Sequence, residues 1–294
     1  MVIYLKNLRF LQKVILILCT LGLSNSFGQN LLKFQHLTTE DGLSQSDVNA
    51  IFQDDNGFMW FGTHDGLNRY DGYNFTVFKP NSKIPKKISS NLIWNIIGDQ
   101  KGDLWIGTTG GGLNYFNQKT EEFKTFKHDP KDENSIKSNH IRVSFIDSSN
   151  RLWVGNSKGI DMADLTKPVD SLKFQHFNLY QNSSIPTRNI DNVTTFFEDS
   201  KHQVWIGGVI GLSKVSKDKN GDTYFQYVNK QINLPQVEVR SIVEDSFGNL
   251  ILATSYGLYR YLPNEEKNQT QLIRKGAYIT VSISNNHIWA GTDE

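Results

Sequence analysis

The side chains best suited to bind a ligand are those that vary between copies of a repeated segment while their neighbours stay alike. One such set occupies the second position of an apolar segment in each copy: Asn49, Trp94, Arg142, Thr194 and Arg240. A second set lies in the short loop before a recurring glycine: His64-Asp65, Thr109-Gly110, Ser157-Lys158, Val209-Ile210 and Ser255-Tyr256. Because binding residues concentrate on loops carried by a constant scaffold, this variation predicts a site.

These residue types favour a carbohydrate as the ligand. An aromatic ring beside guanidinium and amide donors suits a sugar or an acidic oligosaccharide. The alternative is that these residues form ordinary surface loops and that the functional contact is made by another domain. The residues predicted to bind the ligand are Asn49, His64, Asp65, Trp94, Arg142 and Arg240.

The histidines do not have the spacing of a metal site. The chain has seven, and they fall in separate segments: His36, His64, His128, His140, His176, His202 and His287. No pair has the short spacing of metal ligands, so no metal and no other cofactor is expected. The acidic turn at 54–57 could bind calcium, but its copies at 99–102 and 199–202 carry too few oxygens, which favours hydrogen bonding within the turn.

Catalysis is the main alternative to binding. Glycosidases need a pair of carboxylic acids that converge on the substrate. Asp47, Asp191 and Glu238 precede or begin the varying segments, so an enzyme remains an open alternative. Most other acids fall in turns or on polar segments.

A repeat of about 46 residues must position these side chains. Its centre contains Trp60, and the equivalent positions follow at intervals of 38 to 52 residues: Trp105, Trp153, Trp205, Ile251 and Trp289. An apolar segment ending in Asp precedes this position in the complete copies, and two short segments follow it. Four short strands joined by turns, at this period, predict a blade of a β-propeller.

The repeat also assigns roles to its recurring residues. The tryptophan is large enough to fill the interface between two blades. The glycine two residues after it, as in Gly62, would let the backbone of the next blade approach closely. The glycine at Gly66 and its equivalents suits a positive φ in the turn between the second and third strands. The Asp that ends the first strand, as in Asp54, is expected to accept hydrogen bonds from backbone amides of the turn.

Residues 1–28 are expected to form a secretory signal peptide, with basic residues before an apolar run at 14–23. A membrane anchor is a weaker alternative, because ten residues are too few for a bilayer core that needs about 20. A lipid anchor at Cys19 is another, disfavoured because Leu18 stands where a small residue is expected. Residues 29–294 would then be a periplasmic domain, and without Cys19 it has no cysteine.

The positions within the repeat at which the domain begins and the sixth copy stops predict an incomplete ring. Residues 33–36 match 173–176, which form a fourth strand, so the domain would begin with an outer strand that belongs to the last blade. The sixth copy stops after two strands, at 278–283 and 288–291. We therefore expect an all-β fold with five complete blades and a truncated sixth, as a fragment of a seven-bladed ring that exposes unpaired edges.

The first repeat resembles the two-component regulator propeller family in Asp41-Gly42-Leu43-Ser44 and in the segment from Gly57 to Gly72. The resemblance covers nearly all of the chain after the signal. It implies the periplasmic sensor part of a hybrid histidine kinase, in a family that commonly senses breakdown products of polysaccharides. Members typically carry two seven-bladed propellers, a membrane helix, a histidine kinase and a DNA-binding region. No kinase motif occurs here, so this segment is not expected to be an enzyme.

The resemblance also implies the partners. They are an oligosaccharide ligand, the downstream sensor and kinase domains of a longer chain, and a second copy in a homodimer. The net charge of +1, from 31 basic and 30 acidic residues, gives no reason to expect nucleic acid as a partner. A propeller-type glycosidase or lyase and a protein-interaction scaffold are the alternatives. The scaffold is less favoured, because the Gly-His and Trp-Asp pattern of WD40 blades is absent.

Overall fold

The computed structural model describes residues 36–80, 87–156, 158–179, 192–263, 269–285 and 287–292. The chain divides into two units, Met1–Leu37 and Thr38–Glu294, and the second contains all the strands described here. The expected signal peptide and the expected strand residues 33–35 lie outside the described residues. Among those that are described, no helix is long and apolar enough to cross a membrane.

The described part of the second unit is all-β, as predicted, and consists of blades whose strands follow one another in sequence order. Blade one comprises β1 (Val48–Gln53), β2 (Met59–Thr63), β3 (Gly66–Tyr70) and β4 (Phe75–Phe78). Blade two comprises β5 (Ile93–Gly98), β6 (Leu104–Thr108), β7 (Leu113–Asn117) and β8 (Glu122–Phe126). Blade three comprises β9 (Ile141–Ile146), β10 (Arg151–Asn156), β11 (Gly159–Asp164) and β12 (Gln175–Phe177).

The remaining strands continue the same pattern. Blade four comprises β13 (Val193–Glu198), β14 (Val204–Gly208), β15 (Gly211–Lys217) and β16 (Thr223–Tyr227). Blade five comprises β17 (Val239–Glu244), β18 (Leu250–Thr254), β19 (Gly257–Leu262) and β20 (Gln269–Lys275). A sixth sheet has two strands, β21 (Tyr278–Ser284) and β22 (His287–Thr292). The helical segments described are short: η1 (Thr39–Asp41), η2 (Val169–Ser171) and α2 (Asn229–Ile232).

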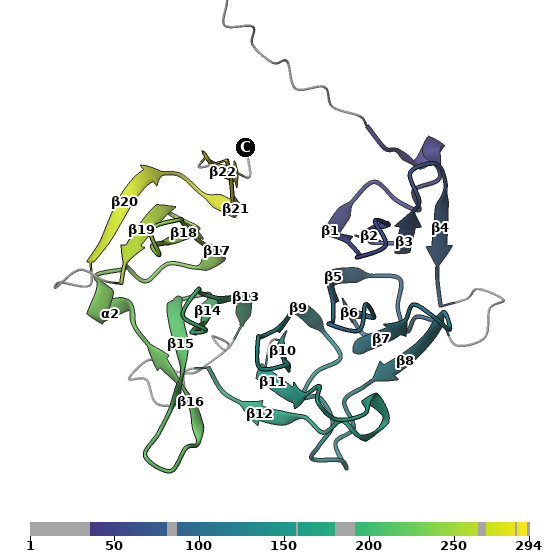
Figure 1. Cartoon of the computed structure of the whole chain (residues 1–294), viewed down its shortest axis with the longest axis horizontal. Helices are drawn as coiled ribbons and strands as arrows, with labels where there is room; N and C mark the ends of the chain where they lie inside the picture. The colour runs from purple at the N-terminus through teal and green to yellow at the C-terminus, as the bar shows by residue number, and fades with distance from the viewer. Residues whose placement is uncertain are drawn as a thin grey trace, which may run out of the picture. The chain divides into compact units, whose positions relative to one another are not determined.

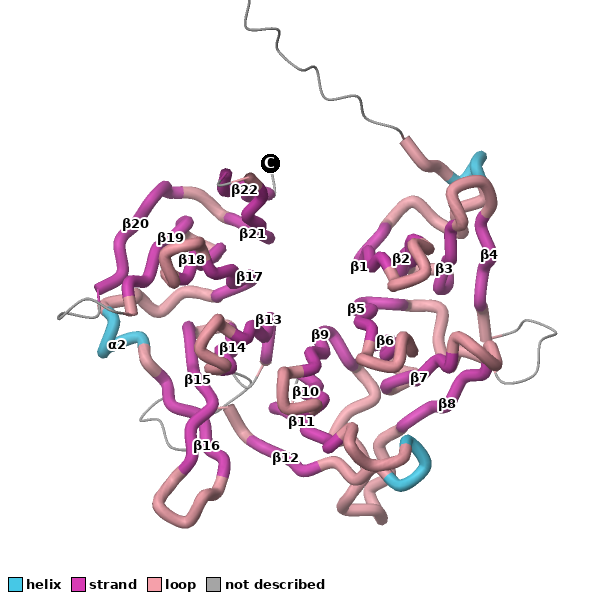
Figure 2. Tube along the Cα trace, viewed as in Figure 1, coloured by secondary structure: helices cyan, strands magenta, loops and turns pink. Residues whose placement is uncertain are grey.

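The first strand of every blade lies on the inner side of an arc, and the fourth lies outside (Figure 1). Each inner strand contacts the next one along the chain, from β1 through β5, β9, β13 and β17 to β21. Loops and turns connect the strands at the two ends of each blade (Figure 2). Among the described strands, none of blade one pairs with β21 or β22, so the arc is not a closed ring.

The recurring tryptophans lie between blades, as predicted. Trp60, Trp105 and Trp153 are completely buried, and Trp205 is 5% exposed. Each packs with residues of the following blade; Trp60, for example, shares a core cluster with Ile93 and Ile106 of blade two. This packing joins neighbouring blades through apolar contact. In the sixth sheet, by contrast, Trp289 is 55% exposed.

The Asp that ends each inner strand organises the turn, as expected. Asp54 accepts hydrogen bonds from the backbone N–H groups of Asn56 and Phe58, each at 3.0 Å. Its second oxygen also accepts the indole N–H of Trp60, at 2.7 Å, a bond that the sequence pattern did not predict. The same bond recurs in blades two, three and four: Trp105 to Asp99, Trp153 to Asp147 and Trp205 to Asp199. The carboxylate thus fixes both the turn and the rotamer of the buried ring.

The glycine after the tryptophan provides the close approach that was predicted. A Cβ built on Gly62 would lie 2.6 Å from Ile93 Cγ2, and one on Gly207 would lie 2.4 Å from the Val239 carbonyl oxygen. Both neighbours belong to the inner strand of the following blade.

The glycines before the third strand mostly adopt the expected left-handed conformation. Gly66 has φ +123°, and Gly112, Gly159 and Gly211 also have positive φ. Gly257 is not among the positive-φ glycines, so the prediction is wrong in blade five. There a Cβ would instead lie 2.5 Å from Leu272 Cδ1 on the neighbouring strand β20. The Arg274 carbonyl oxygen lies 3.0 Å from the same Cβ and can adjust less than the end of the Leu272 side chain, so packing against β20 favours glycine here.

Candidate functional site

A β-bulge places the candidate residues at the start of every inner strand. The register between β1 and β2 shifts between Val48 and Ala50, which leaves Asn49 as the extra residue. The same shift occurs around the equivalent residues of blades two to five: Trp94, Arg142, Thr194 and Arg240. Bulges redirect a side chain relative to the regular pleat. The second position of the strand varies because it is outside the regular ladder of the blade.

Three of the predicted residues come together across blades one, two and three. The His64 ring from the β2–β3 loop lies 6.0 Å from the Trp94 ring, centroid to centroid, at an angle of 56°. The Arg142 guanidinium carbon lies 5.5 Å from the centroid of the same indole. These three residues, which we call the Trp94 cluster, join the β2–β3 loop of blade one to the bulges of blades two and three.

Two members of the cluster have unused hydrogen-bonding capacity. Trp94 is half-buried, and its indole N–H is buried without a hydrogen-bond partner. Arg142 is exposed, and its guanidinium donates to no acceptor among the described residues. A buried donor without a partner is uncommon in folded proteins, and a bound water or ligand is one explanation for it.

The other predicted residues already have partners in the protein. Asn49 donates from Nδ2 to the Ile93 carbonyl oxygen at 2.8 Å, so it links the first two bulges. The Asp65 carboxylate is 2.5 Å from Lys79 Nζ. Arg240 donates from Nε to Glu238 Oε2 at 2.8 Å. Their direct role in binding remains a prediction.

Several neighbours of these residues were not predicted from the sequence. His64 Nδ1 is 3.7 Å from Asp47 Oδ2, and both side chains are substantially exposed. The backbone of His140 forms a bridge with Thr109, which brings the start of blade three to the β6–β7 loop. The proximity of Asp47 could have been inferred, because β1 and β2 form a hairpin whose ends pair Val48 with Thr63.

One buried acid, Asp161, is engaged within blade three. Asp161 is buried, which raises its pKa, while a hydrogen bond from His176 acts in the opposite direction. Its oxygens accept from His176 Nδ1 at 2.7 Å, the Lys137 N–H at 2.9 Å and Asn156 Nδ2 at 3.1 Å. Because these donors satisfy the carboxylate, we assign it a structural role. Among the described residues, no group of three His, Cys, Asp or Glu side chains is arranged to hold a metal ion.

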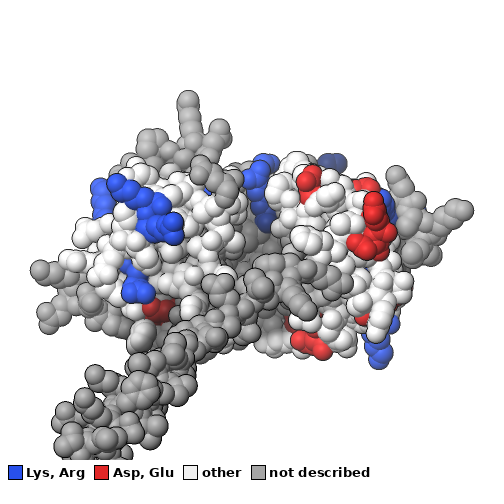
Figure 3. Space-filling model, turned by 90° about the horizontal axis from the view of Figure 1, so that it is seen from above, with Lys and Arg blue, Asp and Glu red and all other residues white. Residues whose placement is uncertain are grey.

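Both signs of charge occur on the face drawn in Figure 3. Basic side chains lie mainly on one side of this face and acidic side chains mainly on the other. This distribution agrees with the near-zero net charge of the sequence. Ligand recognition by a single charged group is therefore easier to reconcile with this face than recognition of a polyanion such as nucleic acid.

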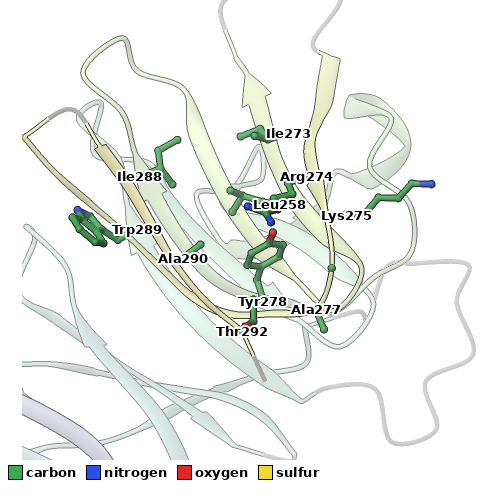
Figure 4. A pocket seen from close by; sticks show the side chains of 11 residues that line it. Leu258, Ile273, Arg274, Lys275, Ala277, Tyr278, Ile288, Trp289, Ala290 and Thr292 are labelled. Atoms are coloured by element: carbon green, nitrogen blue, oxygen red, sulfur yellow. The ribbon is translucent and has the colours of Figure 1, made fainter. Parts of the chain in front are cut away.

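A pocket of about 910 Å³ lies between β20 and the hairpin of β21 and β22 (Figure 4). It is lined by residues such as Leu258, Tyr278 and Ala290, and by Arg274 and Lys275. Leu258 and Ala290 occupy framework positions of the repeat, where other blades pack against one another. We therefore read this pocket as part of the blade-packing surface and place the candidate site at the Trp94 cluster.

Comparisons with known proteins agree with this architecture. A family described as two component regulator propeller matches residues 42–65 and 87–110. The chain is 31% identical to Histidine kinase P4 of Formosa agariphila over 208 residues, which are 69% of this chain and 15% of the kinase. This chain therefore spans a small part of the length of that relative.

Solved structures share the fold. The extracellular domain of a hybrid two component system from B. thetaiotaomicron has a TM-score of 0.56 at 23% identity, covering 88% of this chain and 40% of that one. A virginiamycin B lyase from Staphylococcus aureus has a TM-score of 0.58 at 13% identity, covering 89% of this chain and 80% of the lyase. At these identities the likeness shows the propeller fold alone.

Proposed function

Because the chain carries the repeats of the two-component regulator propeller family and has the propeller fold, we propose that it is the extracytoplasmic sensor region of a hybrid histidine kinase. In this proposal it binds a soluble oligosaccharide released from a polysaccharide. Binding would be reported to kinase domains elsewhere in a longer chain. The similarity to Histidine kinase P4 supports that arrangement, since the matched kinase is far longer than this segment.

The observation that carries the proposal is the Trp94 cluster. His64, Trp94 and Arg142 occupy positions that vary between repeats, yet they lie together on one end of the blades. A framework residue would be expected to recur, as the buried tryptophans do. An aromatic ring with nearby guanidinium and imidazole donors has the composition of carbohydrate sites.

The proposed location and assembly follow from the same relationship. A secretory signal at residues 1–28 would deliver the domain to the periplasm, with 29–294 as the sensor domain. The kinase domains would lie across the inner membrane in the longer chain. A homodimer is proposed as the signalling form, in keeping with the resemblance to hybrid kinases.

A glycan-active lyase or glycosidase is the competing function. The fold likeness to virginiamycin B lyase does not favour it, since unrelated functions share propellers. Two of the acids near the inner-strand starts also have partners: Asp47 lies beside His64, and Glu238 binds Arg240. The third, Asp191, lies outside the described residues. A protein-interaction scaffold is the remaining alternative.

One experiment separates these functions. The secreted domain is incubated with a panel of plant and algal oligosaccharides, and binding is measured by thermal shift while products are analysed by mass spectrometry. A sensor raises its melting temperature with one class of oligosaccharide and leaves that oligosaccharide intact. Appearance of cleaved product would establish an enzyme instead, and absence of both binding and cleavage would contradict the proposal.

A further inference from the structure

We propose that the ligand of the Trp94 cluster carries an anionic group, a carboxylate or a sulfate, and that Arg142 binds this group. The inference rests on the proposed function, because it names the ligand class of the same site. It goes beyond that function by choosing an acidic sugar over a neutral one and by separating Arg142 from the other candidate arginine, Arg240.

The first argument is the way in which Arg142 is held. Its guanidinium carbon lies 5.5 Å from the centroid of the Trp94 indole, within the range of a cation–π contact. Such a contact orients the guanidinium through its charge and leaves its N–H groups available as donors. Arg142 is exposed and donates to no acceptor among the described residues. An oriented guanidinium with free N–H donors matches the two oxygens of a carboxylate or sulfate.

The second argument is the contrast with Arg69, Arg151 and Arg240. Arg69 lies 2.8 Å from a Glu121 oxygen, Arg151 lies 2.7 Å from Asp147, and Arg240 lies 2.8 Å from Glu238. In each case the protein itself supplies a carboxylate. Arg142, which occupies the bulge position equivalent to that of Arg240, has none among the residues described. A ligand anion would take the place that Glu238 takes beside Arg240.

The third argument is the charge around Arg142. Exposed Lys158 in the β10–β11 loop and exposed His140 lie at the same end of blade three. Neither has an ion-pair partner among the residues that the structure describes. Among the nearby carboxylates, Asp65 is beside Lys79, Asp161 is buried against His176, and exposed Asp47 lies beside His64 at 3.7 Å. Arg142 and Lys158 therefore present positive charge at this end of blade three, and neither has an ion-pair partner among the described residues.

The geometry also revises the role expected for Trp94. The sequence suggested an aromatic platform on which a sugar ring could stack. The ring instead has the Arg142 guanidinium over it and the His64 ring near it. The guanidinium lies over one face of the indole, so we assign Trp94 the additional role of supporting Arg142, which meets the ligand directly.

The test is isothermal titration calorimetry of the secreted domain with three probes: trigalacturonate, its neutral counterpart galactotriose, and a sulfated galactose oligosaccharide. The variants are Arg142→Ala, Arg142→Lys and, as a matched control, Arg274→Ala, an exposed arginine on β20 outside the cluster. Circular dichroism of each variant checks that the fold is retained.

We expect an acidic probe to bind at least about tenfold more tightly than galactotriose, and binding to weaken as salt is added. Arg142→Ala should weaken acidic binding at least about tenfold, which is about 1.4 kcal/mol. Arg142→Lys should give an intermediate loss, because lysine keeps the charge and lacks the planar fork. Arg274→Ala should bind as the parent does.

The two acidic probes distinguish the source of the anion, since a carboxylate site prefers trigalacturonate and a sulfate site prefers the sulfated sugar. Equal binding of galactotriose, unchanged by Arg142→Ala, would overturn this inference and leave the proposed function standing. Failure of all three probes to bind would count against both.

Discussion

Replacing Trp105 by alanine tests the blade architecture at a fully buried position. Trp105 is fully buried and packs with Leu113, Ile141 and Val154 across the interface between blades two and three. Removing its side chain loses the transfer free energy of the indole and leaves a cavity, which together cost about 3–5 kcal/mol in protein cores.

The hydrogen bond from Trp105 to Asp99 adds little to this cost. The Nε1 to Oδ2 distance is 3.2 Å, and Asp99 is only partly buried, so water can replace the lost donor. Trp105→Phe keeps most of the apolar area, leaves a smaller cavity and loses the N–H group, so it should cost about 1–2 kcal/mol. A larger loss of stability for Trp105→Ala than for Trp105→Phe would therefore show that packing of the ring contributes more than its hydrogen bond.

The assay is equilibrium unfolding in urea, followed by far-ultraviolet circular dichroism, with the slope of the transition compared between variants. Trp94→Ala is a useful control, because Trp94 is half-buried and lies at a bulge. We expect it to be clearly less destabilising than Trp105→Ala. A loss below about 1 kcal/mol for Trp105→Ala would refute the placement of this residue between blades.

Two further variants test the packing and the turns of the blades. Gly107→Ala should destabilise the domain by about 1–3 kcal/mol in urea unfolding, because its Cβ would lie 2.9 Å from Ile141 Cγ2 on the next inner strand; an effect near zero would show that this strand can move away. Hydrogen bonds from the N–H groups of Asn74 and Tyr73 lower the pKa of Asp71. The ionised Asp71 carboxylate therefore stabilises the fold fully above the ordinary carboxyl pKa of the unfolded chain, near 4. This stabilisation is lost as the pH falls through the lower pKa that Asp71 has in the folded state. Asp71→Asn should reduce the loss of stability on acidification, measured by thermal unfolding from about pH 6 to pH 2, and an unchanged pH profile would contradict this role of Asp71.

The framework of the blades could be predicted from the sequence because it repeats. The spacing of Trp60, Trp105, Trp153 and Trp205 identified the second strand, and its apolar neighbours identified the first. The turn function of Asp54 followed from its position between two strands. Residues that the fold requires recur in each copy, whereas other residues differ between copies. A single sequence was therefore enough to predict the framework of the blades.

Other features of the fold depend on specific contacts between residues, which the repeat pattern does not reveal. The hydrogen bond from Trp60 to Asp54 was not predicted, although the two residues keep a constant separation of six positions in four blades. Gly257 was wrongly assigned a positive φ, because packing against the backbone of β20 favours glycine just as a left-handed turn does.

The role of the candidate residues in ligand binding stays a prediction. The variation between repeats singled out His64, Trp94 and Arg142, which the structure brings together. It did not reveal the bulge, which depends on a one-residue mismatch between strands, and it did not reveal that Glu238 pairs with Arg240. Side-chain pairing of this kind depends on atomic positions that hydrophobic periodicity does not determine.

The most direct test of ligand binding at the Trp94 cluster uses the six tryptophans as reporters. In the ¹⁵N-labelled domain, each indole N–H signal is assigned by replacing one tryptophan with phenylalanine, and the acidic oligosaccharide that binds most tightly is then titrated. We predict that the Trp94 signal shifts in a saturable manner, while those of Trp60, Trp105 and Trp153, buried between blades, do not move. Saturable binding that leaves the Trp94 signal unchanged, or that shifts only Trp289, would contradict the proposed site.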